Sequence, residues 1–184
     1  MRRAIAAMLA GLAAPAVVAA SVAASGPAYT PGPHNVAFPE GFERHFIRYA
    51  VIDNAERKII RFLYVNPEAF SAARPGEALP HGTVLVMADS RARLGPDGAP
   101  LRDLDGRLIP EAGFFVVAVQ QKEPGWGEGY PPERRNGEWE YASFTPSGER
   151  RAVRLDGCFS CHLQARAGQD FTFAFWDYVQ ARGR

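Results

Sequence analysis

The residues with the most specific chemistry are Cys158, Cys161 and His162, within the stretch CFSCH. They comprise the only two cysteines of the chain, three positions apart, and a histidine directly after the second. At this spacing each thiol can form a thioether with one vinyl group of a porphyrin, and the adjacent histidine can ligate the iron. The motif therefore predicts one covalently attached haem c. Cys158 and Cys161 would be the attachment residues, and His162 the proximal ligand of the iron.

Other uses of the two cysteines fit less well. A redox-active pair of this spacing is expected near the start of a βαβ unit, whereas this pair lies near the C-terminus. A structural zinc site needs four ligands, and the remaining histidines, His34, His45 and His81, have no ligand spacing. A disulfide across two residues would leave His162 without a role.

The N-terminal residues have the pattern of a secretory signal. Arg2 and Arg3 precede an apolar, alanine-rich run that ends in small residues. We expect a signal peptide over residues 1–24, with cleavage after Ala24 or, alternatively, after Ala20. Pro15 interrupts the run, which disfavours an uncleaved membrane anchor. A signal peptide predicts a periplasmic protein, which suits covalent haem attachment because that reaction occurs outside the bacterial cytoplasm.

The rest of the chain is long enough for one domain with one core. Residues 25–37 are rich in proline and glycine and predict an extended leader, and residues 38–184 predict a single c-type haem domain. Of the 21 basic residues, 19 remain once the two N-terminal arginines are removed, against 20 acidic residues. This near-neutral balance gives no reason to expect nucleic acid or an anionic membrane as a partner.

Periodicity divides the domain into strands and helices. Strands are expected near residues 45–52, 58–65, 83–88, 113–122 and 138–144. A short helix through Phe42, Phe46 and Tyr49 is the alternative to the first strand. Helices are expected after Pro67, at the haem motif and over residues 170–182. Asp170 would cap the last of these, although its first residues could instead form a strand. The segments 89–110 and 123–136 are expected to be surface loops. The strand over 113–122 is apolar on both faces and should lie inside the sheet.

One strand carries a charge on an apolar face. Arg61 alternates with Ile59, Leu63 and Val65, and a buried charge is costly unless it has a partner. From the pattern alone, the favoured interpretation is an arginine that reaches the edge of the sheet. The alternative is an arginine in the haem pocket, whose partner would be a distal ligand, a water molecule or a haem propionate.

The order of these pieces resembles the cytochrome P-460 and cytochrome c′-beta family, from about Phe38 to Tyr178. The resemblance rests on IIRFLYVNPEAF, LPHGTVLVM, FFVVAVQQK, GEWEYASF, CFSCH and DFTF. It implies a mainly β (α+β) fold, with an antiparallel β-sheet and a few short helices. It also implies one haem c with His162 as proximal ligand and an open or weakly occupied distal side.

Three positions decide which branch of the family the chain resembles. The distal arginine of the family matches Arg61. The lysine that is joined to the porphyrin edge in the hydroxylamine-oxidising branch falls on Met87, which cannot form that bond. The pocket glutamate of that branch falls on Ala118, and Glu111 or Glu123 would replace it only with a shifted alignment. The c′-beta branch lacks the cross-link and binds nitric oxide or carbon monoxide.

These observations favour a periplasmic monohaem cytochrome that binds or redox-converts nitric oxide or hydroxylamine without the cross-link. If it turns over a substrate, it is an oxidoreductase acting on one of these. The first alternative is an electron carrier in which Met87 is the sixth iron ligand, and the second is an enzyme that oxidises hydroxylamine despite lacking the lysine. Expected partners are a small gaseous or nitrogenous ligand, a periplasmic electron-transfer protein and, by family resemblance, a second copy of the chain. We expect Phe62, Phe115 and Trp139 to form pocket walls. A dense aromatic run near the C-terminus is also expected to wall the porphyrin, with ordinary core packing as the compatible alternative: Phe171, Phe173, Phe175, Trp176 and Tyr178.

Overall fold

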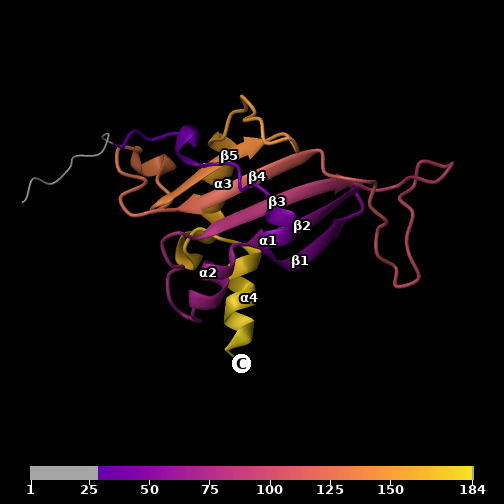
Figure 1. Cartoon of the computed structure of the whole chain (residues 1–184), viewed down its shortest axis with the longest axis horizontal. Helices are drawn as coiled ribbons and strands as arrows, with labels where there is room; N and C mark the ends of the chain where they lie inside the picture. Colours follow the sequence, from indigo (N-terminus) through magenta and orange to yellow (C-terminus); the bar gives the residue numbers. More distant parts are fainter. Residues whose placement is uncertain (1–28, 184) are drawn as a thin grey trace, which may run out of the picture.

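A computed structural model describes residues 29–183, so the predicted signal peptide lies outside the described residues. The centre of the domain is one five-stranded antiparallel sheet whose strands are neighbours in chain order (Figure 1). Its strands are β1 (Ile47–Asn54), β2 (Ile59–Val65), β3 (Val84–Arg91), β4 (Val116–Lys122) and β5 (Trp139–Phe144). The structure confirms the mainly β, α+β fold class.

Short helices surround the sheet. The α-helices are α1 (Phe42–His45), α2 (Pro67–Ala72), α3 (Asp156–Arg166) and α4 (Ala174–Arg182). Three 3-10 turns are η1 (Pro33–Asn35), η2 (Pro132–Arg134) and η3 (Ala167–Gln169). The segment expected as either a strand or a short helix contains both, because α1 ends at His45 and β1 begins two residues later. No helix within residues 29–183 is long and apolar enough to cross a membrane.

The sheet separates two apolar layers because successive side chains of a strand point to opposite faces. On one face, Tyr64, Val86 and Val119 pack with Phe42 of α1 and with the buried Val36 of the leader. On the opposite face, Val65, Leu85 and Tyr141 pack with residues of α2, α3 and α4, among them Ala69, Phe159 and Phe175. The second layer contains the haem motif, so we call this side of the sheet the haem-motif face.

The segment expected as a loop over residues 89–110 is more ordered than predicted. Asp89 to Arg91 continue β3, and the remainder forms two small turns closed by isolated bridges, such as Ala92 with Pro110 and Arg102 with Leu108. These turns project from the end of the sheet (Figure 1). Asp53 of β1 holds them through two hydrogen bonds from Arg107, at 2.8 and 2.9 Å. Strand β3 thus continues through polar residues whose sequence suggests a loop. Polar side chains such as those of Asp89 and Ser90 can lie in the strand because each has a partner.

The described part of the leader, from residue 29, lies against β5. A fully buried carboxylate, that of Glu140, accepts hydrogen bonds from the Tyr29 hydroxyl at 2.5 Å, the Gly32 N–H at 3.0 Å and the Asn35 amide at 2.9 Å. One 3-10 turn, η1, interrupts the extended path. The leader is therefore anchored to the sheet by hydrogen bonds to a buried charge.

Candidate haem-binding site

A cavity of about 670 Å³ lies between the haem-motif face of the sheet and the segment that carries the haem motif. This volume is within the range of small-molecule and cofactor sites, about 300–1,000 Å³. The lining residues from the sheet include Arg61, Leu63, Leu85, Met87, Ala118 and Tyr141, and those opposite include Leu155, Cys158, Cys161, His162, Phe173 and Phe175. Most of these side chains are apolar, as the porphyrin ring of a haem requires.

Helix α3 brings the three residues of the haem motif to one side. Cys158, Cys161 and His162 stand at positions i, i+3 and i+4 of this helix, and side chains at that spacing lie on the same face. Both thiols are free, with Cys158 half-buried and Cys161 exposed. Two thiols and an imidazole on one helical face, at the rim of an apolar cavity, fit the attachment of a haem.

The imidazole of His162 is fixed by the backbone. Its Nδ1 lies 2.6 Å from the carbonyl oxygen of Phe171, and because a carbonyl only accepts, Nδ1 carries the proton. Burial lowers the pKa of His162, although the hydrogen bond to Phe171 opposes this effect. The rings of Tyr141 and Phe173 hold the imidazole from two sides, at centroid distances of 4.9 and 4.8 Å. The result is a neutral imidazole with Nε2 available, which is the form that ligates a metal.

The sheet wall opposite His162 is apolar at its centre. In the register of β2 to β5, Leu63 pairs with Met87, Met87 with Ala118, and Ala118 with Ser143. Met87 and Ala118 are therefore direct neighbours and both line the cavity. No carboxylate occurs among the described residues that line it, and neither Glu111 nor Glu123 takes the place of the pocket glutamate.

Arg61 lines the cavity, but its charge has a partner that the sequence analysis missed. Its Nε and Nη2 donate to the two carboxylate oxygens of Asp89, each at 2.9 Å. Asp89 is the cross-strand partner of Arg61, and its side chain is 6% exposed against 33% for Arg61. The charge of Arg61 is thus paired with a carboxylate of the chain and not with the expected ligand, water or propionate. Asp89 contacts Nε and Nη2, which leaves Nη1 of Arg61 available to the cavity. Asp89 was overlooked because the predicted strand ended one residue earlier.

The prediction of Phe62, Phe115 and Trp139 as pocket walls is wrong. Phe62 lies between Arg61 and Leu63 in β2, so its side chain points to the opposite face of the sheet. There it packs against Phe114. Phe115 precedes β4, is exposed and lies under the guanidinium of Arg91. Trp139, the first residue of β5, is buried in the core and does not line the cavity. The aromatic lining comes from Tyr141 and from two members of the C-terminal aromatic run, Phe173 and Phe175, as expected for that segment.

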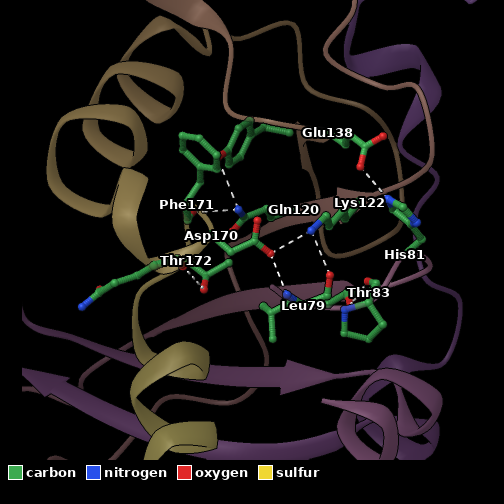
Figure 2. Close-up of polar contacts among 12 residues, drawn as sticks. Leu79, His81, Thr83, Gln120, Lys122, Glu138, Asp170, Phe171 and Thr172 are labelled. Atoms are coloured by element: carbon green, nitrogen blue, oxygen red, sulfur yellow. Dashed lines mark hydrogen bonds and ion pairs between the residues drawn. The ribbon is translucent and has the colours of Figure 1, made fainter. Parts of the chain in front are cut away.

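The predicted helix cap at Asp170 is also wrong. Helix α4 begins at Ala174, and the carboxylate of Asp170 instead forms an ion pair with Lys122 at 2.9 Å (Figure 2). The side chains of Lys122 and Asp170 are only 8% and 11% exposed. The two residues are almost fifty positions apart, so no local pattern in the sequence predicts that they pair. A lysine at the end of an apolar strand does indicate that its charge needs a partner.

Fold and site together define the class of protein: a mainly β domain with a cavity suited to a haem and a histidine placed to ligate its iron. A comparison with protein-family models agrees, because the model for cytochrome P460 matches residues 39–174. The chain belongs to the cytochrome P460 family and is therefore a haem-binding protein. A comparison with curated proteins finds no match.

Proposed function

We propose that the protein is a periplasmic monohaem c-type cytochrome that binds or redox-converts a small nitrogen species, such as nitric oxide or hydroxylamine. The observation that carries the proposal is the placement of His162. Its Nε2 is available in a cavity that Cys158 and Cys161 line from the same helix, while Nδ1 is held by the backbone. The predicted signal peptide supports the periplasmic location, where a second protein would exchange electrons with the haem.

The two thiols would attach the haem, and His162 would hold the proximal coordination position. The bound haem would supply an iron centre that takes diatomic ligands and passes single electrons. The chain's own contribution is to exclude water with Leu63, Leu85 and the aromatic side chains of the cavity. Arg61 can offer its Nη1 as a hydrogen-bond donor to a bound ligand, since Asp89 occupies only Nε and Nη2.

The opposite wall favours a haem without the lysine cross-link. Met87 and Ala118 lie side by side at the positions that correspond to the cross-linking lysine and the pocket glutamate. A thioether has no N–H from which a bond to the porphyrin edge can form, and the methyl side chain of Ala118 has no group that can accept or donate a proton. We therefore expect ligand binding to be retained and hydroxylamine turnover to be slow or absent.

An electron carrier is the second candidate, because Met87 lines the same cavity as His162. If the thioether sulfur of Met87 reaches the iron, both axial positions are filled and external ligands bind poorly. Met87→Ala separates the two functions. In the carrier, this change removes a sulfur-to-iron charge-transfer band and opens the iron to carbon monoxide, whereas in the ligand-binding protein it changes neither.

The proposal is tested by producing the full chain in a bacterium that has a haem-attachment system. We expect one haem mass per chain that survives denaturation and is lost in the double variant Cys158→Ala/Cys161→Ala. The ferrous protein should bind carbon monoxide and nitric oxide with the spectrum of an ordinary c-type haem. A stable, secreted and haem-free protein in that host would contradict the proposal, and a red-shifted Soret band would contradict the absence of the cross-link.

A further inference from the structure

A buried ion pair includes Asp170, the residue next to the Phe171 carbonyl that holds His162. Lys122, the last residue of β4, has its Nζ 2.9 Å from Oδ2 of Asp170 and 2.8 Å from the carbonyl oxygen of Leu79 (Figure 2). The backbone N–H of Leu79 also donates to Oδ2 of Asp170, at 2.8 Å. Two charges this well buried are tolerated only with good geometry and further hydrogen bonds. The pair therefore fixes the position of Asp170 against the end of β4.

Asp170 begins a turn with an unusual backbone. Asp170 and Phe171 have φ values of 46° and 55°, in the left-handed region that residues other than glycine seldom adopt and that is an outlier for a bulky side chain. Such a conformation persists only where the surroundings hold it in place. The turn directs the carbonyl of Phe171 to Nδ1 of His162, at 2.6 Å. The ion pair and the proximal histidine are thus connected through one fixed carbonyl.

A second donor shares that carbonyl. The side-chain amide of Gln120 donates to the Phe171 oxygen at 3.0 Å, as Figure 2 shows, and also lies 3.3 Å from the Tyr141 hydroxyl. Gln120 and Lys122 are two apart on β4, so their side chains lie on the same face of the strand. A carbonyl with two donors attracts each less strongly than it would attract one. Gln120 therefore weakens the hydrogen bond from His162.

We infer that Gln120, Lys122 and Asp170 form a proximal support that sets the strength of the His162–Phe171 hydrogen bond, and through it the reduction potential of the haem iron. The inference rests on the proposed function, in which His162 ligates the iron. A stronger bond from Nδ1 gives the imidazole more anionic character, which stabilises the ferric state. The ion pair strengthens the bond by holding the carbonyl in place, and Gln120 weakens it by sharing the carbonyl. The three are positioning residues.

The test compares Gln120→Met with Gln121→Met in the haem-loaded protein. Gln121 is the adjacent residue of β4, and its side chain bonds only locally, to Glu123 at 2.9 Å. In Gln120→Met the carbonyl serves His162 alone. We expect up to a tenfold shift toward the ferric state, which corresponds to a potential lower by about 59 mV for one electron. We also expect a higher iron–histidine stretching frequency in the resonance Raman spectrum of the ferrous protein. Gln121→Met should change neither quantity.

The second variant should act in the opposite direction. Lys122→Met/Asp170→Asn removes the ion pair without leaving a lone buried charge, so it is more suitable than either single change. The turn loosens and the bond from His162 weakens. We expect a shift toward the ferrous state and a lower stretching frequency. General destabilisation of the site would instead shift the reduction potential in the same direction in this double variant and in Gln120→Met.

The outcomes separate the inference from the proposed function. Reduction potentials that shift in opposite directions in the two variants agree with the inference. Unchanged potentials and frequencies in both variants, or shifts in the same direction, overturn it while leaving the haem assignment intact. A wild-type chain without haem overturns the proposed function, and the inference with it.

Discussion

Replacing Arg61 by leucine should destabilise the fold as well as alter the cavity that Arg61 lines. The carboxylate of Asp89 is 6% exposed and receives two hydrogen bonds from Arg61, both 2.9 Å long. Removing one partner of a fully buried ion pair costs about 3–5 kcal/mol. Because Arg61 is one-third exposed, part of that interaction is screened by solvent. We therefore expect a loss of about 2–3 kcal/mol in the free energy of unfolding.

The double variant Arg61→Leu/Asp89→Leu provides the control. Replacing both partners of a pair by apolar side chains is often neutral, so most of the lost stability should return. In a domain of this size, 1 kcal/mol corresponds to about 2–4 °C in the unfolding temperature. Thermal unfolding of the haem-loaded proteins, followed by circular dichroism, should thus show Arg61→Leu roughly 5–10 °C below wild type, with the double variant between them.

Ligand titration completes the experiment, because both variants lack the guanidinium. The ferrous nitric oxide complex should dissociate faster in both variants if Nη1 of Arg61 donates to the bound ligand. The reasoning is refuted if Arg61→Leu unfolds at the wild-type temperature, or if the double variant is no more stable than Arg61→Leu. Either result would mean that the Asp89 carboxylate does not depend on the arginine.

Three further predictions follow from single contacts. Asp89→Asn leaves the Arg61 guanidinium at the cavity without its counter-charge. If Arg61 is distal, as proposed, azide should bind the ferric protein several-fold more tightly, while carbon monoxide affinity, measured by the same optical titration, stays constant. Gly137→Ala should cost more stability in urea unfolding than Gly82→Ala. Both glycines have positive φ, but a Cβ at Gly137 would meet an aromatic ring at 3.0 Å and one at Gly82 would meet nothing within 4 Å. The hydrogen bond from its arginine partner holds the pKa of Asp53 below its usual value, so this carboxylate stabilises the fold above about pH 4 and less as the pH falls through its folded-state pKa. Asp53→Asn should therefore lower the unfolding temperature more at pH 7 than at pH 3; an equal loss at both pH values would contradict this.

Much of the architecture could be predicted because it depends on local patterns. All five strands were placed to within a few residues by alternating apolar residues, by β-branched and aromatic composition or, for the strand over 113–122, by an apolar run. The haem motif could be recognised because its chemistry needs a short, fixed spacing. A helix places Cys158, Cys161 and His162 on one face whatever the rest of the fold does.

Contacts between distant segments depended on the tertiary structure. Asp89 meets Arg61, and Asp170 meets Lys122, only because the strand register and the C-terminal turn bring them together. Sequence alone indicated that Arg61 needs a partner but not which one, since burial raises the cost of an unpaired charge without specifying what pairs with it. The carbonyl that orients His162 was equally hidden, because every residue has a carbonyl. Its direction is set by the left-handed turn at Asp170 and Phe171, which a sequence of non-glycine residues gives no reason to expect.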